Sequence, residues 1–412
     1  MKKIIINLIS GELFFVLFLY GGVFKGSLGF TVDISAIFLL LTFMSVLFKV
    51  SYKKSINKAV ILPVISLLFL YAVLLISYLF SPGEVYATEK IYKFTIATIP
   101  AIIFSLILFD NKLSVFRFFM LMVVLCTILS LYSFPSIIQR GSSLGFNEGN
   151  YQGLALLSGV SLIVITFYFL TQALTKTTKL ISLLATIIIA FVLFSSGSRM
   201  PIIGFFIASI YLISNTVIFR GSVVKIRNGT RILLLLLIIA IGTLPVILKN
   251  GFLETIIYRF SVLFTEDYGG TSSAGRIERL SSAFEMISGS PFIGNGLGSF
   301  PLYFNGNDIY DYPHNIIIEI FAETGLLGLL AFTLFFLISL IRTISMKHSF
   351  NGFKPTLKIV IVGIFLYYFS NSLTSGDING NRFLFVFMSM MCMFPVIFKN
   401  EDNDIDNIKL GM

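Results

Sequence analysis

Apolar stretches long enough to cross a lipid bilayer recur along the whole chain of 412 residues. A helical span needs about 20 consecutive, mainly apolar residues to cross a hydrocarbon layer ~30 Å thick. We identify twelve such stretches, at residues 4–24, 30–48, 59–80, 91–109, 113–134, 151–171, 179–196, 200–219, 231–248, 316–342, 355–374 and 382–398. The pattern predicts an all-α polytopic membrane protein with about 12 transmembrane helices, forming a single domain over residues 1–412.

Composition excludes a soluble domain. Apolar residues make up 56% of the chain and charged residues 12%, and the mean hydropathy is +0.94. The first apolar run is followed by eleven others and has no small-residue cleavage site, so we expect a retained helix and not a signal peptide. Cys126 and Cys392 both lie inside apolar runs, so we expect neither a disulfide nor a metal framework from them.

The distribution of basic residues predicts the orientation. Alternate loops hold 20 of the 30 lysines and arginines, and the side that is richer in positive charge is expected to be cytoplasmic. Both termini, and with them the tail at residues 399–412, are therefore predicted to be cytoplasmic. Because the basic residues are scattered over short loops, they do not predict a nucleic-acid partner.

One connection is much longer than the others. Residues 249–313 are predicted to form a large extracytoplasmic loop with short amphipathic helices. Ile277, Leu280, Phe284 and Ile287 recur with a helical period, which is typical of a helix on the membrane surface. Ser272 or Ser273 is expected to cap this helix, and Gly289 and Pro291 to end it.

A glycine-rich segment, Pro-Phe-Ile-Gly-Asn-Gly-Leu-Gly, follows at residues 291–298. A nucleotide-binding loop would have to follow the strand of a βαβ unit, and no such strand is predicted. We interpret the glycines as a tight turn that another segment approaches closely.

The chain has two histidines, and the predicted topology places His348 on the cytoplasmic side. His314 is then the only extracytoplasmic imidazole. Pro313 suits the first turn of a helix capped by Asp311 or Tyr312, which would put His314 at the positive helix end and lower its pKa. A neutral imidazole can accept a proton from a hydroxyl group. The alternative is a capping or packing histidine.

Two arginines are predicted at extracytoplasmic helix starts. Arg199 follows Ser-Gly-Ser at residues 196–198, and Arg276 lies near the start of the helix predicted in the long loop. A guanidinium binds a phosphate oxygen pair bidentately, so this pattern favours a diphosphate ligand. The alternative is that each arginine pairs with a lipid headgroup.

Carboxylates are weaker signals. Asp308 and Asp311 lie in a predicted loop, and Glu319 and Glu323 share one face of a predicted helix. Neither pair is accompanied by other residues at metal-ligand spacing, so we expect no metal site.

These motifs resemble the O-antigen polymerase/ligase superfamily of bacterial envelope glycosyltransferases. The resemblance covers residues 140–328 and runs from Arg-Gly at 140–141 and Gly-Phe-Asn-Glu-Gly-Asn at 145–150 through Arg199 to the long loop. In the loop it continues with Ala-Gly-Arg at 274–276, the glycine turn, Pro-His-Asn at 313–315 and Glu-Thr-Gly-Leu-Leu-Gly at 323–328. Where the family often has Pro-Asn, this chain has Gly149 and Asn150.

The resemblance implies a membrane glycosyltransferase that uses undecaprenyl-diphosphate-linked glycans without a nucleotide sugar, a metal or another cofactor. It implies catalytic roles for His314, Arg199 and Arg276. We also expect substrate-binding roles for Arg140, Asn150, Arg279 and Asn315.

We expect a polymerase that joins lipid-linked repeat units of O-antigen, capsule or another surface polysaccharide at the outer face of the bacterial cytoplasmic membrane. Its expected partners are the lipid-linked donor and acceptor, membrane lipids and a chain-length regulator. A ligase that transfers the glycan to lipid A-core or protein would bind the same donor. A lipid-linked oligosaccharide flippase is the rival from another class, but transporters place their charges around a midplane site, whereas these candidates gather at helix ends.

Overall fold

The computed structural model describes residues 10–28, 34–140, 151–171, 175–220, 223–226, 254–265, 270–346 and 356–399. Helices dominate these residues. In the first half of the chain they are α2 (Gly11–Leu28), α3 (Ile34–Lys53), η1 (Lys58–Val60), α4 (Ile61–Leu79), α5 (Val85–Lys93), η2 (Phe94–Thr98), α6 (Ile99–Leu108), α7 (Lys112–Arg140), α8 (Tyr151–Phe167), η3 (Phe169–Thr171), α9 (Lys176–Ser195) and α10 (Arg199–Thr216). After the strands β1 (Val217–Arg220) and β2 (Val223–Ile226) come α12 (Glu254–Thr265), α13 (Thr271–Gly289), α14 (Phe300–Asn305), α15 (Ile316–Ser345), α16 (Thr356–Ser372), α17 (Arg382–Cys392) and α18 (Phe394–Ile397).

The helices confirm an all-α polytopic membrane protein. Among the described residues, 7 helical segments are long and apolar enough to cross a membrane, and further apolar helices of 10–17 residues accompany them. A helix can cross lipid because it satisfies its backbone hydrogen bonds within itself. The number of spans stays a prediction, because the apolar run at 231–248 lies outside the described residues.

A small hairpin ends one predicted span early. The span predicted at residues 200–219 stops at Thr216, and β1 pairs antiparallel with β2 from Val217 opposite Ile226 to Arg220 opposite Val223. Branched and aromatic residues dominate both strands and favour extended backbone, so hydropathy alone misassigned these few residues.

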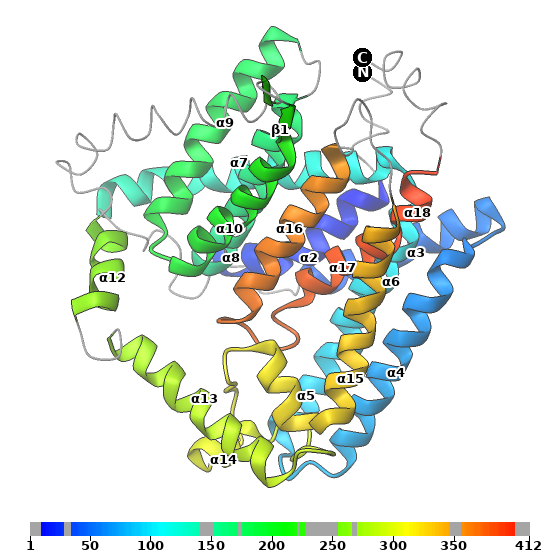
Figure 1. Cartoon of the computed structure of the whole chain (residues 1–412), viewed down its shortest axis with the longest axis vertical. Helices are drawn as coiled ribbons and strands as arrows, with labels where there is room; N and C mark the ends of the chain where they lie inside the picture. Colours follow the sequence, from blue (N-terminus) through cyan, green and yellow to red (C-terminus); the bar gives the residue numbers. More distant parts are fainter. Residues whose placement is uncertain are drawn as a thin grey trace.

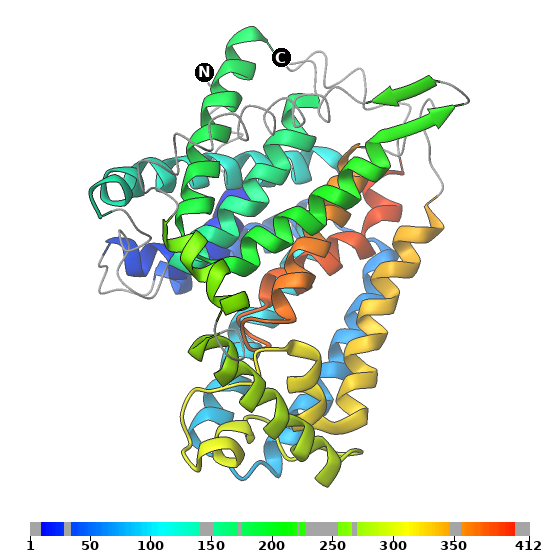
Figure 2. The same ribbon diagram turned by 60° about the vertical axis from the view of Figure 1, so that its left-hand side comes forward.

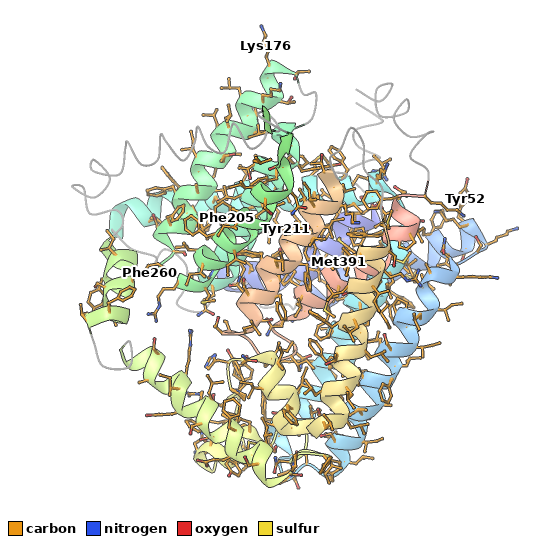
Figure 3. The ribbon with its side chains drawn as sticks, viewed as in Figure 1. Tyr52, Lys176, Phe205, Tyr211, Phe260 and Met391 are labelled. Atoms are coloured by element: carbon orange, nitrogen blue, oxygen red, sulfur yellow. The ribbon has the colours of Figure 1, made fainter. Side chains whose placement is uncertain are left out.

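The helices pack around a buried centre. Figure 1 and Figure 2 show α5, α13 and α14 at one end of the molecule and the β1–β2 hairpin at the other. In Figure 3, Met391 of α17 lies in the centre, whereas Tyr52 of α3 and Lys176 of α9 point outward. Met391 is fully buried and Tyr52 is 82% exposed. Outward apolar side chains on the peripheral helices suit contact with lipid tails.

The glycine turn docks into a break in α15. Gly325 has a φ of 65° and a ψ of −164°, a conformation that interrupts the helix and favours glycine. Residues 291–298 replace the missing helical hydrogen bonds: Gly296 N donates to Glu323 O at 2.9 Å, and Leu326 N donates to Pro291 O at 2.8 Å. A Cβ on Gly294 would collide with the backbone of Glu323 and Gly325. The predicted tight, closely approached turn is confirmed.

The long loop contains the predicted surface helix, now α13. It ends at Gly289 as predicted, but it begins at Thr271 after Gly270, and no serine side chain caps it. Ala283 and Met286 pack into a small core with Phe300 and Ala322, whereas Ile277 and Phe284 are 48% and 55% exposed. Only part of the predicted apolar stripe therefore packs against the protein.

Candidate active site

A cavity of about 340 Å³ lies where α8, α10, α13, α16 and the start of α17 meet. We call it the arginine cavity, because Arg199 and Arg276 both line it. Tyr310 and Tyr312 line it from the end of the long loop, and the segment 373–381 contributes Ser375, Gly376, Gly380 and Asn381. The fold thus brings together two arginines that are far apart in the sequence.

Both arginines project from regions near helix N-termini. Arg199 is the first residue of α10, preceded by Ser198 in extended conformation, and Arg276 lies in the second turn of α13. The positive ends of these helices add to the guanidinium charges. Among the residues that the structure describes, no Asp or Glu lines the cavity, and Arg276 forms no ion pair. This arrangement favours a concentrated negative charge such as a diphosphate.

His314 adjoins the cavity through Tyr312. Their ring centroids are 4.4 Å apart, and Tyr312 lines the cavity while His314 does not. His314 has a φ of 60°, in the left-handed region that residues other than glycine rarely adopt. Such a conformation costs free energy and is found most often at functional sites, where the surroundings impose it.

Burial and the nearby charges of Arg276 and Arg279 lower the pKa of His314 to about 4, and only Asp311 opposes this shift. The imidazole is therefore neutral at physiological pH, as predicted. The predicted cause was wrong, because α15 begins at Ile316 with Asn315 as its N-cap, so Pro313 and His314 precede the helix and neither Asp311 nor Tyr312 caps it. A neutral imidazole has a free ring nitrogen that can accept a proton, although the neighbouring positive charges make it a weaker base.

Residues 184–333 match the family model described as O-antigen ligase. This match supports the resemblance of the chain to the O-antigen polymerase/ligase superfamily. The match includes Arg199, Arg276 and His314, whereas segment 373–381 and α5 lie outside it. No curated protein matches the chain.

Arg279 and Asn315, both predicted to bind substrate, make internal contacts. Arg279 Nε and Nη2 donate to the two carboxylate oxygens of Asp311 at 2.8 and 3.0 Å, and Nη1 donates to Gly275 O at 3.0 Å. Asn315 Oδ1 accepts from Ile317 N and Ile318 N as the cap of α15. Arg279 lies three residues after Arg276 on α13, so the Arg279–Asp311 pair ties that helix to the segment carrying His314.

Two predicted substrate-binding residues are not placed. The backbone of Arg140 ends α7, but its side chain lies outside the described residues, as does Asn150. Their roles stay predictions.

A buried ionic cluster was missed in the sequence. Lys90 Nζ lies 2.5 Å from Glu319 Oε1 and 2.6 Å from Glu323 Oε2, and all three side chains are 1% exposed. The sequence did carry a signal for this cluster. It has a lysine next to an apolar run and two glutamates one helical turn apart, and charges inside spans usually pair. Removing one partner of such a cluster typically costs about 3–5 kcal/mol.

The cluster supports the floor of the arginine cavity. Glu319 Oε1 accepts from Ile378 N at 3.3 Å, and Asn379 Nδ2 donates to Lys90 O at 2.9 Å. Segment 373–381 is thereby fixed against α5 and α15. We assign the cluster a positioning role for the cavity wall.

Proposed function

We propose that this protein is a polymerase that joins undecaprenyl-diphosphate-linked oligosaccharide repeat units at the outer face of the cytoplasmic membrane. The observation that carries the proposal is the arginine cavity itself, where two arginines, and no carboxylate among the described residues, line the wall beside a neutral histidine. Such a site suits a donor whose leaving group is a lipid diphosphate.

In the proposed reaction, the oxygen of an acceptor hydroxyl forms a bond to the anomeric carbon of the donor sugar. The bond between that carbon and the diphosphate oxygen breaks, and undecaprenyl diphosphate leaves with the electron pair. Arg199 and Arg276 stabilise its growing negative charge. His314 accepts the proton of the hydroxyl group.

The family model that matches the chain is described as O-antigen ligase, and this favours a second candidate function. A ligase would use the same donor with lipid A-core or a protein as the acceptor. The test is incubation of the purified protein with the lipid-linked repeat unit alone. A ladder of lengthened lipid-linked products supports the polymerase, whereas products that form only after another acceptor is added identify the ligase.

A flippase would give neither result, since it would move lipid-linked glycan across a liposome membrane without lengthening it. The same liposomes, assayed for both lengthening and translocation, separate the transporter from the enzymes. We also include a chain-length regulator among the partners of a polymerase. Its addition to the purified protein should narrow the distribution of product lengths.

The proposal places the arginine cavity outside the cell. Asn305 in α14 and Tyr52 in α3 are both exposed, whereas the native Cys126 and Cys392 are buried. In intact spheroplasts, Asn305→Cys should react with an impermeant thiol reagent and Tyr52→Cys should not. The reverse labelling pattern would overturn the orientation.

A further inference from the structure

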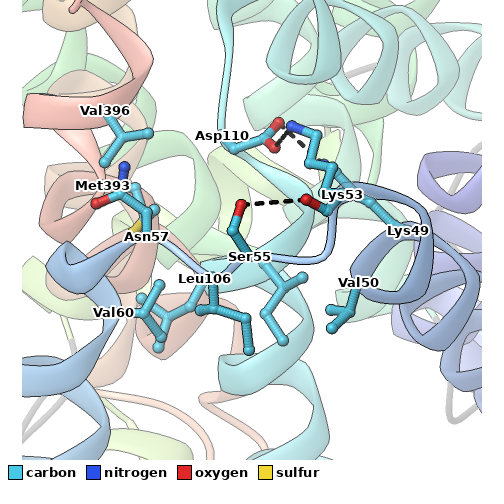
Figure 4. A pocket seen from close by; sticks show the side chains of 12 residues that line it. Lys49, Val50, Lys53, Ser55, Asn57, Val60, Leu106, Asp110, Met393 and Val396 are labelled. Carbon is cyan, nitrogen blue, oxygen red and sulfur yellow. Dashed lines mark hydrogen bonds and ion pairs between the residues drawn. The ribbon is translucent and has the colours of Figure 1, made fainter.

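A second cavity, of about 210 Å³, lies near the end of α17 that points away from the arginine cavity. Phe383 at the start of α17 lines the arginine cavity, and Met393, just after its end, lines the second. We call the second the lysine cavity, because Lys49 and Lys53 of α3 line it together with Asp110. Figure 4 shows Asp110 and the lysines on one side of the drawn group and Val50, Val60 and Leu106 on the other.

The polar side of the lysine cavity carries a net positive charge. Lys49 Nζ donates to Asp110 Oδ1 at 2.9 Å and to Leu108 O at 2.7 Å, and Lys53 pairs with the other carboxylate oxygen. Two ammonium groups therefore share a single carboxylate. Each ammonium has three donors, so both retain capacity for a further acceptor. Residues 34–60 contain four lysines and no Asp or Glu, which strengthens the positive potential around the opening.

The surroundings of the lysine cavity are apolar and exposed. Phe48 is 74% exposed and Ile61 is 55% exposed, and they lie on α3 and at the start of α4. Only 11% of the most apolar stretch of α3 is buried inside the protein. A ligand at this site therefore meets fixed positive charge at one end and an apolar helix surface at the other.

We propose that the lysine cavity binds the phosphodiester headgroup of an anionic membrane lipid, whose acyl chains lie along the exposed faces of α3 and α4. Charge complementarity selects an anionic headgroup over a zwitterionic one. The adjoining apolar surface selects a lipid over free phosphate, which would gain nothing from it. The proposal is independent of the glycosyltransferase function.

The test is native mass spectrometry of the full-length protein in detergent with equal amounts of phosphatidylglycerol and phosphatidylcholine. The parent protein should retain one phosphatidylglycerol in preference to phosphatidylcholine. Lys53→Gln should lower this retention about fivefold, the usual effect of one lysine near an anionic lipid surface. Lys53 is 49% exposed, so its replacement should leave the fold intact. Lys176→Gln removes an exposed lysine from α9, outside this cavity, and should change nothing.

Asp110→Asn gives a prediction of opposite sign. It removes the carboxylate that competes with the headgroup for both lysines, so retention of phosphatidylglycerol should rise about fivefold. A merely structural ion pair would give no such rise. An equal loss with Lys53→Gln and Lys176→Gln would mean general surface attraction, and displacement of the lipid by millimolar inorganic phosphate would mean a simple anion site. Either result, or no gain with Asp110→Asn, overturns the proposal.

Discussion

The arginine cavity and the lysine cavity lie at opposite ends of α17, and they differ in whether a lining carboxylate pairs with their basic side chains. In the lysine cavity, Asp110 pairs with both basic side chains. Among the described residues that line the arginine cavity none is acidic, and Asp311 pairs with Arg279, which does not line the cavity. Arg276 forms no ion pair with a residue that the structure describes, so its charge remains available to a bound anion. The comparison supports the proposal that the arginine cavity binds the diphosphate of the substrate.

The two cavities also differ in how they are assembled. The lysine cavity is lined mainly by residues 49–60, together with residues 106–110 and with Met393 and Val396 from near the end of the chain, and ion pairs to Asp110 join the first two segments. The arginine cavity depends on long-range contacts that fix its walls. Asp308, for example, accepts hydrogen bonds from the backbone N–H groups of Glu84, Val85 and Tyr86 and so ties the long loop to the start of α5. Slight burial opposes ionisation of Asp308, but these three donors lower its pKa and keep it anionic.

Among the substitutions near the two cavities, loss of His314 should have the largest effect on the rate of chain extension. His314→Ala removes the proposed base beside the arginine cavity and should lower chain extension by roughly 10²–10⁴-fold. The control is His348→Ala, predicted on the cytoplasmic side and expected to be silent. The measurement is the rate of chain extension by each purified variant. More than about half the parent rate with His314→Ala would make His314 a structural residue.

Exchange of one basic residue for the other tests whether fork geometry matters. Arg199→Lys and Arg276→Lys keep the charge but lose the bidentate donor, so chain extension should fall about tenfold to a hundredfold. The matched exchange in the lysine cavity, Lys53→Arg, should leave the rate unchanged. Near-parental rates from both arginine variants at equal expression would remove the catalytic role of this cavity.

The Arg279–Asp311 pair should have a smaller effect, because it acts on position only. Arg279 and Asp311 are 27% and 12% exposed, so the loss of this pair is worth ~1 kcal/mol, or about a fivefold change in rate. Asp311→Asn should therefore lower kcat modestly and leave the thermal midpoint within a few degrees. An unchanged kcat would show that α13 holds Arg276 in place without this pair.

The pH dependence should show the smallest effect. With a pKa of about 4, His314 stays mostly neutral at pH 5, so chain extension at pH 5 should lie within about twofold of that at pH 7. With an unshifted pKa of ~6.5, the neutral fraction of the histidine, and with it the rate, would instead fall about 25-fold from pH 7 to pH 5. Arg276 and Arg279 both lower this pKa, so Arg279→Gln should move the acid limb upward. Carbon NMR of labelled histidine, with His348 as the second signal, measures the shift directly.

Local rules predicted much of this molecule. The apolar runs located the long apolar helices of the described residues, because hydrocarbon thickness sets the length of a span, but they did not locate α12 or α14. The glycines at 291–298 correctly predicted a tight turn, since their backbone conformations are open to few other residues. Local rules failed where a neighbouring segment decides the outcome. The predicted start of α15 was Pro313, whereas the helix begins at Ile316. The side chain of Asn315 caps it, because its oxygen accepts from the first N–H groups of the helix and its amide nitrogen donates to Leu373 O.

The sequence by itself indicated the membrane architecture, the resemblance to the O-antigen polymerase/ligase superfamily and a short set of candidate residues for binding an anion or moving a proton. Those properties depend on composition, periodicity and side-chain chemistry, which a linear chain already carries. Only the tertiary structure decided that Arg199 and Arg276 line one cavity. It also decided which charges pair: Asp311 forms an ion pair with Arg279, and Lys90 forms ion pairs with Glu319 and Glu323. Such pairings join residues tens to hundreds of positions apart. A buried charge needs a partner of opposite charge, and the packing of the helices decides which residue lies close enough to serve.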